Sequence, residues 1–95
     1  MPYEYTRPEG YTEEEITEVI TESIASRREF AQRRLAAYAA RCTTFEQHCG
    51  MSTQTFLEQF EAGSLDDQPE WFDWYAAAQG QQIWSRKHAI LAHLT

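Results

Sequence analysis

The sequence predicts an all-α protein in which a long helix, a short corner helix and a second long helix pack as an antiparallel helical hairpin. Apolar residues recur every three or four positions, and almost no stretch alternates apolar and polar residues as a half-exposed strand would. Turn formers are scarce, with 4 glycines and 3 prolines in 95 residues. We expect a single helical domain over residues 12–95, preceded by an extended arm over residues 1–11 that contains Pro2 and Pro8.

The first predicted helix spans residues 13–48. Thr12 and Glu15 have the spacing of a capping box, in which each side chain accepts a hydrogen bond from the other residue's backbone. Gly50 is a typical C-terminal stop. One apolar stripe follows this helix, made by Ile16, Val19, Ile20, Ile24, Ala31, Leu35, Tyr38, Cys42, Phe45 and Cys49.

The second predicted helix spans residues 53–62 and turns the chain. Ser52 is its expected N-cap, and Gly63 its expected stop. Its apolar residues Phe56, Leu57 and Phe60 lie three and four positions apart and therefore share one face.

The third predicted helix spans residues 68–94. Asp67 and Glu70 repeat the capping-box spacing, and Pro69 is tolerated in a first turn. Gly80 is expected to be a soft point, because glycine costs about 1 kcal/mol relative to alanine inside a helix. The apolar residues of this helix are Trp71, Trp74, Tyr75, Ala78, Ile83, Trp84, Ile90, Leu91 and Leu94.

These helices are too long for a compact monomer. At 1.5 Å per residue the first would measure roughly 54 Å and the third roughly 40 Å, whereas a compact chain of this size has a radius of gyration of about 12 Å. The corner should hold an aromatic core of Phe45, Phe56, Phe60, Trp71, Phe72 and Trp74. The first turns of the first helix should extend beyond it and expose Ile16, Val19, Ile20 and Ile24. Such a stripe marks a protein interface, so we expect a dimerised or partner-bound chain.

Charge and composition argue against several classes of function. The net charge is −7, from 15 Asp and Glu against 8 Lys and Arg, which disfavours binding to a phosphate backbone and suits a basic protein partner. No apolar stretch approaches the roughly 18 residues of a membrane span. Residues 1–10 lack the basic and apolar segments of a signal peptide, so we expect a cytoplasmic protein that does not bind membranes.

No residue pattern predicts catalysis, a metal or a cofactor. Asp66 and Asp67 are adjacent carboxylates at a helix start, where a capping role is far more common than acid–base chemistry. Cys42 and Cys49 would lie roughly 10 Å apart along one helix, too far for a disulfide. With His48 they still lack the further ligands that zinc needs. We therefore predict no catalytic residue, no metal ligand, no cofactor and no enzymatic activity.

Two segments suggest nucleic-acid binding only weakly. Residues 50–63 resemble part of a helix-turn-helix, but the helix that follows begins with acidic and aromatic residues rather than the basic and amide side chains of a DNA reader. The first helix also carries a local basic stretch, which is most simply a solvated face. An acidic partner or a nucleic acid is the alternative. This stretch contains Arg27, Arg28, Arg33, Arg34 and Arg41.

Residues 42–86 resemble a family of small prokaryotic all-helical proteins of uncharacterised activity that is thought to include antitoxins of toxin–antitoxin pairs. In that pattern a long helix precedes Gly-Met-Ser, a Phe-containing short helix, a Gly-x-Leu-x-Asp turn and a Phe-x-Trp helix start. The matching residues are Gly50, Met51, Ser52, Phe56, Phe60, Gly63, Leu65, Asp67, Phe72, Asp73 and Trp74, with Trp84 further along. The resemblance implies a protein that binds and neutralises a toxin.

The expected binding site combines the exposed stripe with the acidic residues beside it. In this interpretation the stripe of Ile16, Val19, Ile20 and Ile24 supplies the apolar contact. The glutamates Glu13, Glu14, Glu18 and Glu22 pair with a basic toxin surface. The alternative is a structural homodimer in which two copies bury the same stripe against each other.

Overall fold

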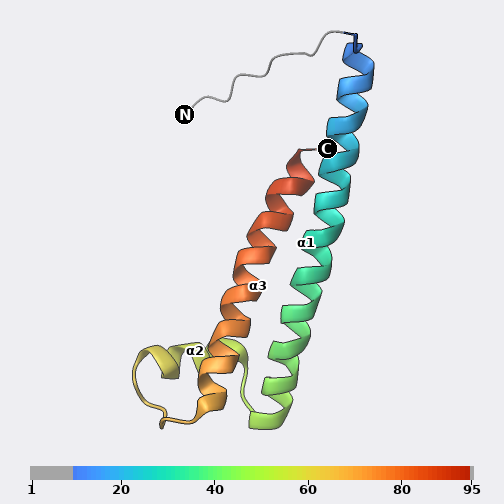
Figure 1. Ribbon diagram of the computed structural model, residues 1–95. Coiled ribbons are helices and arrows are strands. Elements are labelled where there is room, and N and C mark those ends of the chain that lie inside the picture. The colour runs from blue at the N-terminus through green and yellow to red at the C-terminus, as the bar shows by residue number, and fades with distance from the viewer. Residues whose placement is uncertain (1–9, 95) are drawn as a thin grey trace.

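The computed structural model describes residues 10–94, and these residues form three α-helices and no strand (Figure 1). The helices are α1 (Glu13–Cys49), α2 (Thr53–Glu61) and α3 (Pro69–His93). α3 runs back along α1 in the opposite direction, and α2 lies beside the corner where the chain turns (Figure 1). The predicted all-α hairpin is confirmed, and every predicted helix end lies within one residue of the observed one. The predicted arm falls largely outside the described residues.

The first two helices begin and end as the sequence signals predict. The Glu15 backbone N–H donates to Thr12 Oγ1 over 3.1 Å, and the Thr12 N–H donates to Glu15 Oε1 over 3.1 Å, which completes the capping box. Gly50 adopts a left-handed conformation with φ of 69° and ends α1. Ser52 Oγ accepts the Thr55 N–H over 3.1 Å and caps α2.

The start of α3 differs from the prediction. Its N-cap residue is Gln68, whose side chain makes no capping hydrogen bond, so the capping box expected of Asp67 and Glu70 is wrong. Asp66 instead accepts the Trp71 indole N–H over 2.7 Å and the Gln68 side-chain amide over 2.9 Å. Of the two adjacent carboxylates, Asp66 therefore binds an aromatic side chain rather than capping the helix backbone.

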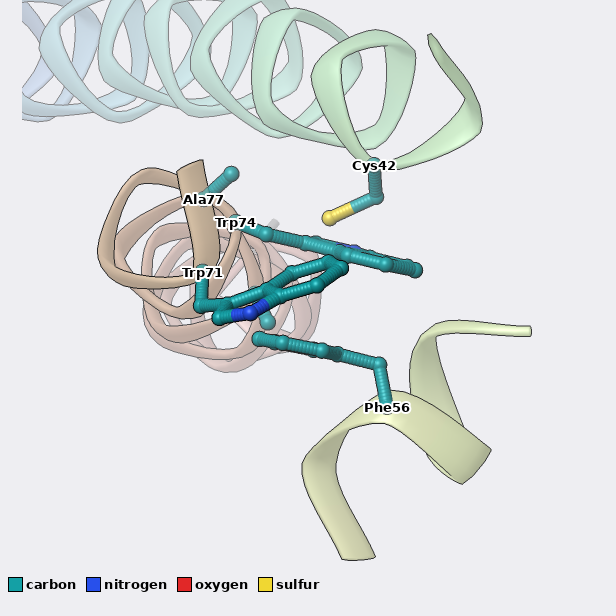
Figure 2. Packing of buried hydrophobic residues seen from close by; sticks show 6 residues of the cluster. Cys42, Phe56, Trp71, Trp74 and Ala77 are labelled. Atoms are coloured by element: carbon teal, nitrogen blue, oxygen red, sulfur yellow. The ribbon is translucent and has the colours of Figure 1, made fainter. Parts of the chain in front are cut away.

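The core is a stack of aromatic rings at the corner (Figure 2). Trp74 and Phe56 are fully buried, and their rings stack with centroids 4.1 Å apart and planes only 3° apart. Phe45 of α1 stacks on Trp74 at 5.5 Å, so the Trp74 ring joins all three helices. The Trp74 indole N–H donates to Thr53 Oγ1 over 3.1 Å, which satisfies the one polar atom of this buried side chain.

Not all of the predicted aromatic core is buried. Trp71 is buried, and Phe45 and Phe60 are half-buried against the core. Phe72 makes an edge contact with Phe60, but its side chain is 60% exposed, so its assignment to the core is wrong. Phe72 follows the buried Trp71 by one residue, and one residue turns the side chain about 100° around the helix axis. It therefore lies at the edge of the core, in contact with Phe60 of α2 but largely exposed.

Gly80 is a point of close approach between α3 and α1. A Cβ atom placed on Gly80 would lie 2.6 Å from Cδ1 and Cε1 of the Tyr38 ring. Further along the hairpin Ala31 is fully buried on α1, which agrees with small residues letting the two helices approach closely. The expected soft point is thus a site where glycine makes room for a ring.

The hairpin is elongated because α1 is longer than α3. The Cα radius of gyration is 19.5 Å and the principal extents are 62 × 28 × 20 Å. The Trp84 ring contacts Phe30 at 5.5 Å, and Gly80 faces Tyr38. These two contacts fix which residues of the antiparallel helices lie opposite each other. They place the end of α3 at His93 opposite roughly residues 21–25 of α1. α1 therefore continues past the end of α3 (Figure 1).

Candidate protein-binding surface on α1

The part of α1 that extends past α3, residues 13–20, is called the free end below. It measures about 12 Å along the helix axis. Val19 is 61% exposed and Ile20 is 48% exposed, whereas Ile16 and Ile24 are half-buried. Two aliphatic side chains thus remain exposed on a segment that has no other described helix beside it (Figure 1).

The four aliphatic residues predicted as one stripe occupy two faces. Ile16, Ile20 and Ile24 are four residues apart and follow the face on which Ala31 is buried further along. Val19 lies about 100° around the helix from Ile20. The structure therefore places Ile24 at the border of the α1–α3 contact, Ile16 and Ile20 on its continuation, and Val19 to one side.

The charge of α1 changes sign along its length. Between Glu13 and Ser26 the only charged residues are glutamates, and between Arg27 and Arg41 arginines dominate. The glutamates predicted for the site are all exposed: Glu13, Glu14 and Glu18 lie in the free end, and Glu22 lies just beyond it. Glu15 is committed to the capping box. The free end is consequently acidic, with exposed aliphatic groups in its midst.

A shallow groove of about 560 Å³ begins at Val19 and follows the side of α1. Val19 and Phe30 are its apolar residues, with Glu22 near one end and Arg33 at the other. The complete lining is Val19, Glu22, Ser23, Ser26, Arg27, Phe30 and Arg33. Because the groove continues from the free end, a partner held at Val19 could extend its contact along α1.

The predicted basic stretch is partly held by aromatic rings. The Arg27 guanidinium lies 4.7 Å from the Phe30 centroid and 5.5 Å from that of Trp84. Arg34 lies 5.6 Å from Trp84 and donates a hydrogen bond of 3.0 Å to the Tyr38 hydroxyl. This stacking gives the exposed arginines Arg27 and Arg34 a structural role, because they cover aromatic rings at the edge of the α1–α3 contact. It gives no separate reason to assign them a ligand.

The cysteines occupy the core rather than a reactive site. Cys42 is buried and lies against the Trp74 ring (Figure 2), and Cys49 is half-buried. Burial raises the pKa of both thiols, and for Cys42 it outweighs the lowering effect of the Thr53 side chain. Nearby Glu46 and Glu70 add to the increase at Cys42 and Cys49 respectively, so neither thiol favours the nucleophilic thiolate form. Within residues 10–94 no three His, Cys, Asp or Glu side chains converge as metal ligands.

A second exposed apolar surface was not singled out from the sequence. Ile83, Ile90 and Leu94 are apolar residues of α3, and they are 50%, 56% and 58% exposed. Ile83, Ile90 and Leu94 are seven and four residues apart, a spacing that places them on one face of a helix. Phe72 precedes Ile83 by eleven residues and lies on the same face. The sequence does not show which face of α3 is buried, because that depends on where α1 and α2 pack against it.

Comparison of the chain with protein-family models, with curated proteins and with solved structures finds no match. Among the described residues no helix is both long and apolar enough to cross a membrane. The resemblance to antitoxin-like proteins stays a prediction.

Proposed function

We propose that the protein is a non-enzymatic helical interaction module that binds a basic protein partner through the free end of α1, and that this partner is a toxin which it neutralises. The observation that carries the proposal is the exposure of Val19 and Ile20 among glutamates on a helix end that extends past α3. Exposed aliphatic groups supply the buried contact of an interface, and surrounding charge selects the partner.

The acidic charge favours a different protein over a second copy at this site. Two free ends brought together would place the glutamates of both copies in one interface. Like charges in contact cost several kcal/mol, whereas a basic surface turns the same groups into an attraction. A homodimer through the stripe of α1 is therefore the weaker alternative.

The resemblance gives the partner its proposed class. A toxin that acts on nucleic acid needs a basic surface to hold its substrate, and an acidic helix end can cover such a surface. Neutralisation would then require only binding, with no catalytic group on this chain.

The test begins with a search of the neighbouring genes for a small basic protein, which then serves as the candidate toxin; its absence would count against the antitoxin assignment. We expect the purified proteins to form a complex and co-expression to relieve growth arrest caused by that protein. Ile20→Asp should abolish both effects, because it places a charge in the apolar contact. Thr21→Asp is the matched control, since Thr21 is exposed on another face of the same turn and should retain both.

The possible results separate the parts of the proposal. Absence of binding and of relief would show that the antitoxin assignment is wrong. Binding that Ile20→Asp leaves unchanged would show instead that the free end is not the contact.

A further inference from the structure

The outer face of α3 carries a straight row of exposed apolar side chains, called the outer stripe below. Its members are Phe72, Ala76, Ile83, Ile90 and Leu94. At about 100° of rotation per residue, all five point within about 40° of one another. The row extends about 33 Å along the helix. The buried Trp74 and Ala77 lie on the other side of α3, so the outer stripe faces away from α1. At its first residue, the Phe72 ring makes an edge contact with Phe60 of α2.

The outer stripe is symmetric about its central residue. Ile90 and Ala76 lie seven residues on either side of Ile83, and Leu94 and Phe72 lie eleven residues on either side. Two copies of α3 that cross antiparallel at Ile83 would pair each of these residues with its counterpart. Ile90 would meet the small Ala76 and Leu94 would meet Phe72, while Ile83 would meet itself. Such reciprocal contacts are the defining property of a two-fold interface.

The charge of α3 favours the same antiparallel arrangement. Glu70 and Asp73 are the charged residues of its first half, and Arg86 and Lys87 are those of its second half. An antiparallel pair places the acidic half of each helix beside the basic half of the other, with exposed Asp73 as the acidic group nearer the second copy, because Glu70 lies on the side of α3 toward Cys49 of α1. A parallel pair would bring like charges together. The polar residue Gln79, which interrupts the row, would then face Lys87 of the second copy, where its amide oxygen can accept a hydrogen bond.

From the symmetry and the charge we propose that the outer stripe binds a second copy of this chain, in an antiparallel α3–α3 dimer with Ile83 on the two-fold axis. This interface differs from the free end of α1, so it does not rest on the proposed function. The dimer would leave both free ends exposed at opposite ends of the assembly, because α1 extends past the C-terminal end of α3 (Figure 1).

Light scattering across a dilution series tests the dimer. We expect the full chain to have a mass of twice 11.1 kDa. Ile83→Asp puts two carboxylates face to face on the axis and should raise the dissociation constant by more than about 100-fold. Gln82→Asp is the matched control, because Gln82 is exposed on a different face of α3 and the variant should remain a dimer. Circular dichroism should show the same helix content in all three proteins.

Ile20→Asp separates this interface from the one on α1. The variant should remain dimeric, because Ile20 lies on the free end and not on α3. A monomeric wild-type chain at about 100 µM would overturn the proposal. A dimer that Ile83→Asp leaves intact, or that Ile20→Asp dissociates, would overturn it as well.

Disulfide cross-linking in a Cys49→Ser background tests the orientation. The antiparallel dimer predicts that a chain with Ala76→Cys cross-links to a chain with Ile90→Cys when the two are mixed and oxidised. Chains with Ala76→Cys alone should not cross-link, because the two positions would lie about 21 Å apart and a disulfide needs Cα atoms within about 7 Å. Cross-linking of Ala76→Cys with itself would contradict the antiparallel arrangement.

Discussion

At the corner of the hairpin all three helices meet around the Trp74 ring, which is fully buried and contacts Phe45 of α1 and Phe56 of α2. Among residues 10–94, α3 has only α1 beside it at the open end, and past the end of α3 no other described helix lies beside α1 (Figure 1). The corner thus holds most of the buried apolar surface, and the open end exposes aliphatic residues. We infer that stability is concentrated at the corner and recognition at the open end and on the outer face of α3.

The largest expected loss of stability comes from a substitution in the aromatic core at the corner. Trp74→Ala removes the ring that joins the three helices and should lower the free energy of unfolding by about 3–5 kcal/mol. Val19→Ala, at the open end, should change it by no more than about 0.5 kcal/mol, because Val19 is 61% exposed. Urea unfolding of both variants measures the difference. Similar losses from the two substitutions would contradict the separation of stability from recognition.

A second substitution probes the middle of the hairpin, between the two ends. Gly80→Ala would place a methyl group 2.6 Å from the Tyr38 ring and should cost about 1–3 kcal/mol of stability. In a Tyr38→Ala background the same change should become neutral or stabilising, because alanine is the better helix former. A double-mutant cycle from denaturant unfolding gives this coupling energy. Additive effects would show that the ring does not set the requirement for glycine.

A third substitution tests the open end locally. Thr12→Ala removes the capping hydrogen bond to the Glu15 N–H and should destabilise the first turns of α1 by about 1 kcal/mol. Because the free end is not packed on α3, we expect faster amide hydrogen exchange there and little change in global unfolding. Ser52→Ala, the equivalent change at α2, should reduce global stability instead. Equal global losses would mean that the free end unfolds together with the core.

The smallest effect concerns pH at the corner. Hydrogen bonds from the Trp71 indole and the Gln68 side chain lower the pKa of Asp66 below its ordinary value of 3.8. Because the Asp66 pKa is lower in the folded state, its charged carboxylate stabilises the folded protein above pH 3.8. This stabilisation is lost as the pH falls through the pKa of the folded state. We expect Asp66→Asn to flatten this part of the curve of melting temperature against pH. An unchanged curve would exclude Asp66 as its source.

Local chemistry explains what could be predicted from the sequence. Thr12, Ser52 and Gly50 act on the backbone within a few residues, so their patterns locate helix ends without knowledge of the fold. The lengths of the helices then required that α1 extend past α3. The aromatic residues near the turn had to cluster there, because α3 returns along α1.

The faces of α3 were harder to predict, because the helix is apolar on more than one side. Trp71 and Phe72 are adjacent and both have large aromatic side chains, yet only Trp71 is buried. The choice between them depends on where α1 and α2 lie, which is a tertiary property. The capping box expected of Asp67 failed for a related reason, since the neighbouring Asp66 binds the Trp71 indole across the turn.

The free end of α1 also bears on the lifetime of the chain in a cell. A helix end that does not pack against α3 opens more often than one packed in a core, and proteases cut backbone that is open. A partner bound at Val19 and Ile20 would hold this segment closed, since a ligand stabilises the state to which it binds. The same extension that we propose for recognition would then couple survival of the free chain to the supply of its partner.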